Sequence, residues 1–177
     1  MPPQSRDNSD IRYHCPLCGT PSSQFSGKFF RCPSCEGIFR NPETLLSPEA
    51  EKNRYEKHNN NPEDAGYRNF VLPFVSAIAD RMPQGSRGLD FGAGPGPVVS
   101  IMLKEKGFLC DLYDPFFHNS PELLERTYDF IFCCEVIEHF YSPAAEFPKL
   151  FSLLRPGGSL FCMTHIHTDD IDFPSWY

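Results

Sequence analysis

The chain has 177 residues, enough for one full domain or for a modest domain with a small module attached to it. Of these residues 40% are hydrophobic and 22% are charged, as in an ordinary globular protein, and the net charge is −7. Residues 62–177 carry 8 Lys and Arg against 16 Asp and Glu, so a broad nucleic-acid surface is disfavoured. The first ten residues lack the apolar core of a signal peptide, and no later run is as apolar as a membrane helix. We therefore expect a soluble, cytoplasmic protein that makes no membrane contact.

Two CxxC pairs lie near the amino terminus, separated by thirteen residues that suffice for a short hairpin. Without a secretory signal the thiols stay reduced, so a metal site is favoured over disulfides. The spacing predicts a zinc ribbon over residues 1–42, with an iron–sulfur site or a redox pair as the alternatives. A module of this size has too little core to fold unaided, and we therefore expect the zinc to be structural. The ribbon could also be a docking surface for a protein partner. The predicted ligands are Cys15, Cys18, Cys32 and Cys35.

Residues 43–84 are interpreted as a helical linker. Their first part is polar and rich in turn residues, which predicts a short helix followed by a loop. Residues 69–82 then carry apolar side chains at nearly helical spacing, and Pro73 is expected to kink this helix or to start its main part.

A glycine-rich turn at residues 92–96 joins a predicted strand, RGLDF, to a predicted helix that begins at Pro97. Strand, glycine turn and helix in this order open a doubly wound α/β domain. The dinucleotide pattern GxGxxG fails in both registers, because Pro97 or Val99 stands where the third glycine is required. An acidic residue followed by three alternate glycines is complete instead, at Asp90, Gly92, Gly94 and Gly96.

With this pattern the chain resembles the class I S-adenosylmethionine-dependent methyltransferases, in particular the methyltransferase domain 23/11-like group. Later segments agree: a second strand ends at Asp114, residues 128–140 are similar to the family's fourth strand with a charged edge after it, and a helix, the turn LRPGG and an apolar strand follow. The resemblance implies a Rossmann-like doubly wound sheet over residues 85–177. It also implies that Asp114 accepts hydrogen bonds from the ribose hydroxyls and that the glycines admit the amino-acid part of the cofactor. Asp90 would orient that loop or a water beside the cofactor's ammonium group.

The letters EVIEH follow the predicted fourth strand and match a motif of some O-methyltransferases, in which it holds a divalent metal near the acceptor hydroxyl. In metal-free relatives the same glutamate lines the cofactor pocket and the histidine is a base, and a purely structural role is the third alternative. The matching residues are Glu135, Glu138 and His139, and His165 or His167 would be a fourth ligand.

An upstream stretch resembles a bacterial group of ribbon-bearing methyltransferases of unassigned substrate. There, Tyr55, His58, Asn59 and Tyr67 would form a lid over the cofactor, whereas the alternative is a solvated loop.

The sequence departs from the family pattern in two places. Only thirteen residues separate Asp114 from Tyr128, so the third strand is expected to be very short or absent. No residues follow that would form the sixth and seventh strands, since the chain stops at Tyr177. We expect this sequence to be a fragment of a longer enzyme, with a partner that completes the sheet as the alternative.

The motifs together predict an S-adenosylmethionine-dependent methyltransferase that acts on a small molecule, with a slight preference for O-methylation over C- or N-methylation. An RNA methyltransferase that contacts RNA through the ribbon is one alternative, and the acidic balance disfavours it. The other alternative is a non-catalytic module that recruits a partner through the ribbon. The sequence specifies neither the acceptor nor the oligomeric state.

Overall fold

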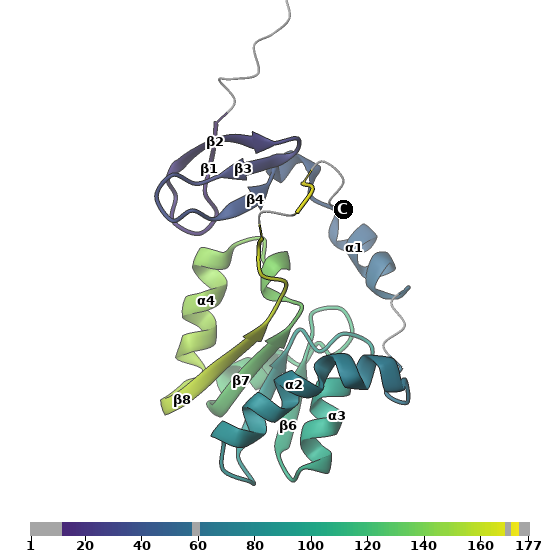
Figure 1. Cartoon of the computed structure of the whole chain (residues 1–177). Helices are drawn as coiled ribbons and strands as arrows, with labels where there is room; N and C mark the ends of the chain where they lie inside the picture. Colours follow the sequence, from purple (N-terminus) through teal and green to yellow (C-terminus); the bar gives the residue numbers. More distant parts are fainter. Residues whose placement is uncertain (1–11, 58–60, 169–170, 174–177) are drawn as a thin grey trace, which may run out of the picture. The chain divides into compact units, whose positions relative to one another are not determined.

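The computed structural model describes residues 12–57, 61–168 and 171–173, which divide into two compact units (Figure 1). His58 and Asn59 of the predicted lid lie outside the described residues. The first unit contains residues up to 47 and also takes in 141–144 and residues from 166 onward, which we had expected in the methyltransferase-like domain. The second unit contains residues 48–140 and 145–165.

The first unit is built on a small antiparallel sheet, which agrees with the predicted ribbon. Its strands pair in chain order, so each strand turns back on the one before it. The ring of Phe30 is 3% exposed, and it meets the rings of Tyr13 and Phe39 at centroid distances of 4.8 and 5.9 Å. A 3₁₀ turn, η2 (Pro42–Thr44), follows the sheet. The strands are β1 (Arg12–His14), β2 (Pro21–Ser26), β3 (Phe29–Arg31) and β4 (Ile38–Arg40).

The second unit contains a four-stranded parallel sheet in the order β6-β5-β7-β8. The chain starts in the middle of this sheet at β5, adds β6 on one side, and then crosses to β7 on the other. In such doubly wound sheets, ligands bind at the carboxyl ends of the strands where the order reverses. The strands are β5 (Arg87–Phe91), β6 (Leu109–Tyr113), β7 (Tyr128–Cys134) and β8 (Leu154–Met163).

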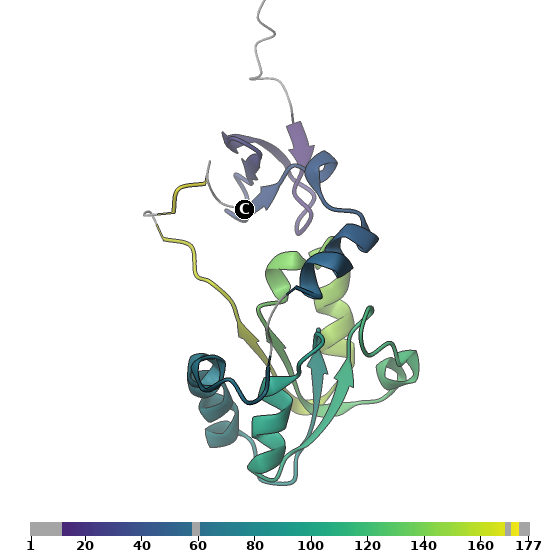
Figure 2. The ribbon, with the colours of Figure 1, turned by 90° about the vertical axis from the view of Figure 1, so that its right-hand side faces the viewer.

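Helices cover both faces of the parallel sheet, as buried parallel strands require (Figures 1 and 2). Helices α2 (Ala65–Arg81) and α3 (Val98–Glu105) pack on one face, where Met102 lies in the same cluster as Phe130 and Phe132. Helix α4 (Pro143–Ser152) packs on the other, through Leu150. The short helix α1 (Pro48–Tyr55) has no buried residue. Among the described residues, no helix is long and apolar enough to cross a membrane.

Helix α2 starts earlier than the apolar spacing indicates. It begins at Ala65, because the Asp64 carboxylate accepts hydrogen bonds from the backbone N–H groups of Gly66 and Tyr67 at 2.7 and 3.1 Å. Pro73 therefore lies inside the helix and does not start it. Tyr67 consequently stands in the first helical turn and not in a loop.

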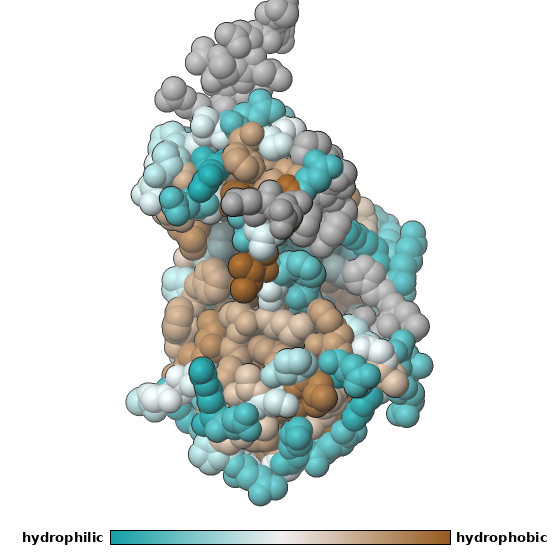
Figure 3. Space-filling model, in the orientation of Figure 1, coloured by the Kyte–Doolittle hydropathy of each residue, from teal (hydrophilic) through white to brown (hydrophobic). Residues whose placement is uncertain are grey.

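Two connections in the sheet can be compared with the sequence predictions, the one before β7 and the one before β8. Between β6 and β7 the described chain forms a 3₁₀ turn, η3 (Pro121–Glu125), and no strand, which confirms the missing third strand. LRPGG is part of β8 and not a separate turn: Tyr128 pairs with Leu154, whereas Phe130 already pairs with Ser159, so the residues between form a bulge. Apolar residues gather over β8, the edge strand of the described sheet (Figure 3).

A buried polar pair joins β5 to α3. The Ser100 hydroxyl donates to Oδ2 of Asp90 at 2.7 Å, and the two residues are 0% and 4% exposed. Burial in this apolar surrounding disfavours the charged carboxylate and raises the pKa of Asp90 to about 7. Asp90 thus fixes the start of α3, and through it the glycine turn between β5 and that helix.

We expect Asp90→Asn to change how stability depends on pH. The unfolded chain loses this proton near pH 4, whereas the folded chain keeps it to about pH 7, so in this interval the wild-type free energy of unfolding falls as pH rises. Asparagine cannot ionise, so its free energy of unfolding does not fall in this way. The stability of the variant relative to the wild type should therefore increase by roughly 1–3 kcal/mol from pH 5 to pH 8. Urea unfolding at both pH values measures this difference.

Asp129→Asn is the matched control for that experiment. The backbone N–H of Arg87 and the Arg155 guanidinium lower the pKa of Asp129, so its ionisation is complete at pH 5 in both folded and unfolded chains. Asp129→Asn should therefore shift stability equally at pH 5 and pH 8. If Asp90→Asn also shifted stability equally at pH 5 and pH 8, the wild-type Asp90 carboxyl would not have the raised pKa that its burial requires.

Candidate functional site

The glycine turn after β5 is fixed by contacts on both sides. Gly92 has φ +87° and Gly94 has φ +61°, values that favour glycine. A Cβ atom on Gly92 would lie 2.6 Å from Cγ2 of Val136, in the segment that follows β7. On the other side, the N–H groups of Gly92 and Ala93 donate to the carbonyl of Tyr113 at 2.8 and 3.1 Å. No side chain fits at Gly92, so backbone lines this edge of the sheet.

Asp114 stands directly after β6 and is 7% exposed. Its Oδ2 accepts a hydrogen bond from the N–H of Gly94 at 2.9 Å, and its Oδ1 accepts two, from Phe116 at 2.8 Å and Phe117 at 3.1 Å. A carboxylate offers about four acceptor positions, and three are occupied here. Asp114 therefore joins the glycine turn to the turn after β6, and its Oδ2 can accept one further donor before a backbone bond is displaced.

Glu135 is the first residue after β7 and has a strained backbone, with φ +54°. A non-glycine residue in this region costs on the order of 1 kcal/mol, and such strain concentrates at functional sites. Its N–H donates to the carbonyl of Met163 at 2.8 Å, which anchors the turn to the end of β8. Burial, together with the nearby Glu138, raises the pKa of the Glu135 carboxyl. The carboxyl lies 3.9 Å from Nδ1 of His165.

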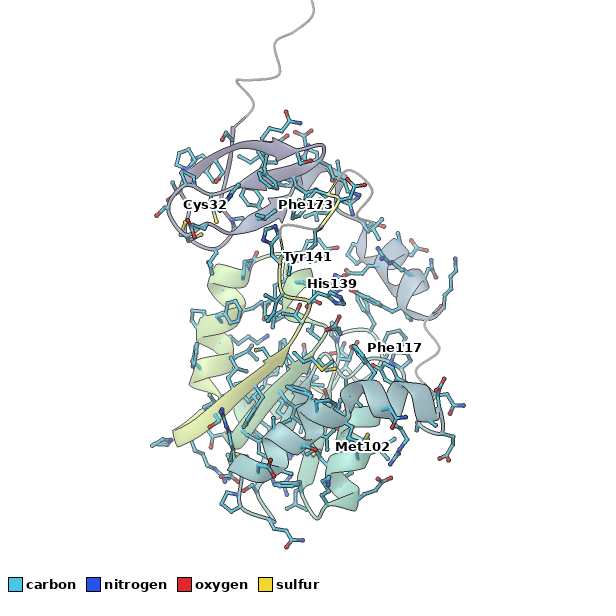
Figure 4. All side chains as sticks on the ribbon, viewed as in Figure 1. Cys32, Met102, Phe117, His139, Tyr141 and Phe173 are labelled. Carbon is cyan, nitrogen blue, oxygen red and sulfur yellow. The ribbon has the colours of Figure 1, made fainter. Side chains whose placement is uncertain are left out.

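Glu138 and His139 lie in the 3₁₀ turn η4 (Ile137–His139) that follows Glu135 (Figure 4). The His139 imidazole meets the ring of Tyr55 edge to face, with centroids 6.0 Å apart. The ring centroids of Tyr55 and Phe116 are 6.4 Å apart. Tyr55 of α1 thus contacts both the turn that holds Asp114 and the turn that holds His139.

Tyr67, the other described residue of the predicted lid, approaches the same edge from α2. Burial, and then the charges of Cys134 and Glu135, raise the pKa of its phenol to about 12. Tyr67 is therefore a neutral hydrogen-bond donor at physiological pH. The two described lid residues come from different helices, and each lies near a different part of the EVIEH segment.

The predicted zinc ligands converge. The Sγ atoms of Cys15, Cys18, Cys32 and Cys35 all lie within 4.8 Å of one another, and three pairs are 3.4–3.6 Å apart. Tetrahedral coordination with zinc–sulfur bonds of about 2.3 Å needs sulfur atoms about 3.8 Å apart, so the cluster fits zinc. The backbone N–H groups of Cys35 and Ser34 donate to the Cys32 sulfur, and these bonds lower the pKa of that thiol.

Within the described chain, the four cysteines are the one group of three or more possible metal ligands that converge in this way. The metal site predicted at Glu135, Glu138 and His139 stays a prediction. Of its two possible fourth ligands, His165 lies near Glu135, whereas His167 packs on Phe173 in the first unit at a ring distance of 5.3 Å.

Three residues of this site are absent from the sequence predictions. Ser100 holds Asp90, Val136 presses against Gly92, and Phe116 contacts Tyr55. Their letters carry no motif, because serine, valine and phenylalanine are common in any core. Only Val136 had a usable signal, since it lies inside EVIEH.

Comparison with known proteins agrees with this geometry. A family model described as "Methyltransferase domain" matches residues 63–177. The ubiquinone biosynthesis O-methyltransferase of Sodalis glossinidius is 31% identical over 77 residues, which are 44% of this chain and 31% of that protein. The enzyme of the same name from Histophilus somni is 29% identical over 93 residues, 50% of this chain and 37% of that one. The chain thus spans about a third of the length of these curated relatives.

A crystal structure of coclaurine N-methyltransferase with N-methylheliamine and SAH bound aligns with 67% of this chain and 44% of that one. Its TM-score is 0.38 and the identity is 16%, a likeness too weak to support an argument. The family model, in contrast, covers well over half of the chain, including the parallel sheet and the turns at its carboxyl edge. The chain therefore belongs to the methyltransferase domain family.

Proposed function

We propose that the protein is an S-adenosylmethionine-dependent methyltransferase that acts on a small molecule, with a hydroxyl oxygen as the preferred acceptor. The observation that carries this proposal is the meeting of the glycine turn, the Asp114 carboxylate and the strained Glu135 at the carboxyl ends of β5, β6 and β7. The curated relatives, which bear the name O-methyltransferase, support the preference for oxygen.

Each element of this edge has a part in holding the cofactor. The side-chain-free turn at Gly92, Gly94 and Gly96 lets the amino-acid part approach the backbone closely. Asp114 has one open acceptor position for a ribose hydroxyl, and binding both hydroxyls requires it to release one backbone amide. Glu135 lines the pocket. Asp90 does not touch the cofactor in this proposal, but its bond to Ser100 holds α3 and so the glycine turn.

When bound, S-adenosylmethionine supplies an electrophilic methyl group, so the protein's main work is to orient the acceptor. A hydroxyl acceptor must also lose its proton, and His139, in the turn after Glu135, is the residue we assign as base. Glu138 next to it would favour the protonated imidazole that results. Tyr55, in ring contact with His139, and Tyr67 are the lid residues that would exclude water from the reacting atoms.

The four cysteines hold a structural zinc ion in this proposal. The sulfur spacing supports it, and so does the small core of the ribbon, which has few buried residues of its own. A ribbon held together in this way can also serve as a docking surface for a protein partner.

Asp114→Asn should weaken binding of S-adenosylhomocysteine about tenfold to a hundredfold. The substitution removes the charge that strengthens a hydroxyl bond, and it places an NH₂ group where Gly94 now donates. Isothermal titration calorimetry measures the change. Asp111→Asn is the control in the same strand: Asp111 pairs with Arg87 and Arg126, so it should leave affinity unchanged.

The outcomes of this titration separate two claims. If the unaltered protein bound neither S-adenosylmethionine nor S-adenosylhomocysteine, the proposed function would be wrong. If it bound both while Asp114→Asn and Asp111→Asn matched it, only the role of Asp114 would fail.

The purified protein should contain one zinc ion per chain, measured by elemental analysis. Cys32→Ser should remove that zinc and expose the ribbon to proteolysis, because the metal supplies much of the ribbon's stability. Cys162→Ser, an exposed cysteine on β8 outside the cluster, should keep the zinc. Iron with visible absorption in place of zinc would contradict the assignment.

A further inference from the structure

Tyr55 stands on a helix that does not pack as a core element. Helix α1 has the sequence PEAEKNRY, contains no buried residue, and has Tyr55 as its one aromatic side chain. The Tyr55 hydroxyl donates to Oε1 of Glu51, one turn earlier in the same helix, at 2.9 Å. This bond restrains the direction in which the ring leaves the helix. The ring, and not the hydroxyl, is therefore the part of Tyr55 that meets the site.

The Tyr55 ring connects turns that follow two strands which are not neighbours. In the second unit β5 lies between β6 and β7. The ring centroid of Tyr55 lies 6.4 Å from that of Phe116, the second residue after Asp114, and 6.0 Å from that of His139 (Figure 4). The N–H of Phe116 in turn donates to Oδ1 of Asp114 at 2.8 Å. Tyr55 thus links the backbone that Asp114 holds to the imidazole of His139.

The backbone of the turn η4 is already held by the core. Ile137 and Phe140, on either side of Glu138 and His139, pack against the apolar cluster that includes Leu150 of α4. The described members of that cluster include neither Glu138 nor His139. Core packing therefore fixes the backbone of the turn, whereas the Tyr55 ring acts on the imidazole itself.

We infer that Tyr55 is a positioning residue for the His139 imidazole and that it sets the place of this base relative to the turn that Asp114 holds. This role deepens the proposed function and rests on it, since His139 is the base there. A base must lie within hydrogen-bond reach of the acceptor's proton while the cofactor is in place, so the two turns need a fixed separation. An edge-to-face ring contact favours one mutual orientation, so Tyr55 orients the imidazole as well as covering it.

The test is the mobility of the His139 ring, measured by ¹³C relaxation in the unliganded protein with labelled histidine. The chain has six histidines, and His139→Gln identifies the signal that belongs to His139. Tyr55→Leu removes both ring contacts, so the order parameter of the His139 ring should fall from about 0.8 to below about 0.6. Tyr55→Phe keeps the ring and removes only the bond to Glu51, so it should keep the wild-type order parameter.

Phe70→Leu is the matched control. Phe70 lies on α2, is 46% exposed, and stacks on Tyr67 with ring centroids 6.0 Å apart. The substitution therefore removes a ring contact of similar length from the other described lid residue. It should leave the His139 ring at the wild-type order parameter.

Phe116→Leu tests the far end of the link. If Tyr55 depends on Phe116 for its place, this variant lowers the order parameter of the His139 ring by less than Tyr55→Leu does, and the double variant matches Tyr55→Leu. An unchanged order parameter in Tyr55→Leu, or separate falls that add up in the double variant, would overturn the inference. Failure to bind S-adenosylmethionine in calorimetry would refute the proposed function instead. The relaxation data on the unliganded protein would still decide whether Tyr55 restrains His139.

Discussion

The site depends first on the carboxylate of Asp114, which is buried and holds three backbone amides. A buried charge is stable only where hydrogen bonds replace its lost water, and here the donors come from the glycine turn and from the turn after β6. The same bonds that satisfy Asp114 therefore set the distance between two turns that are far apart in the sequence. A ligand that hydrogen-bonds to Asp114 therefore lies beside the two turns whose backbone Asp114 already holds.

A second constraint links the glycine turn to the turn after β7. Gly92 and Val136 are so close that a Cβ atom on Gly92 would lie 2.6 Å from Cγ2 of Val136, and no side chain fits at position 92. Val136 directly follows Glu135, whose left-handed backbone turns the chain sharply at the end of the strand. Strain at Glu135 is tolerated because neighbours on both sides, the carbonyl of Met163 and the backbone at Gly92, fix the turn in this form. The three turns thus form one connected edge.

Local patterns in the sequence predict most of this fold, because the ribbon, the glycine turn and the apolar strands each have a distinctive spacing. The start of α2 was missed because its signal is one capping residue, Asp64, and not a run of apolar residues. LRPGG was interpreted as a turn, since glycine and proline usually end strands, yet the paired residues on either side of it keep it within β8. Contacts such as that of Tyr55 with His139 have no local signal at all.

The ribbon unit is not formed by one continuous stretch of the chain. Among the described residues, 141–144, 166–168 and 171–173 belong to the same compact unit as residues 12–47. Independent domains are usually joined by one exposed linker that few contacts cross. Here, Leu46 accepts the hydrogen bond of Tyr141, and Phe25 packs on Phe173, so both later stretches contact residues that precede 47 within this unit. The compact unit that contains the ribbon is therefore not one continuous stretch of chain, and the chain passes from one unit to the other directly after Phe140 and after His165.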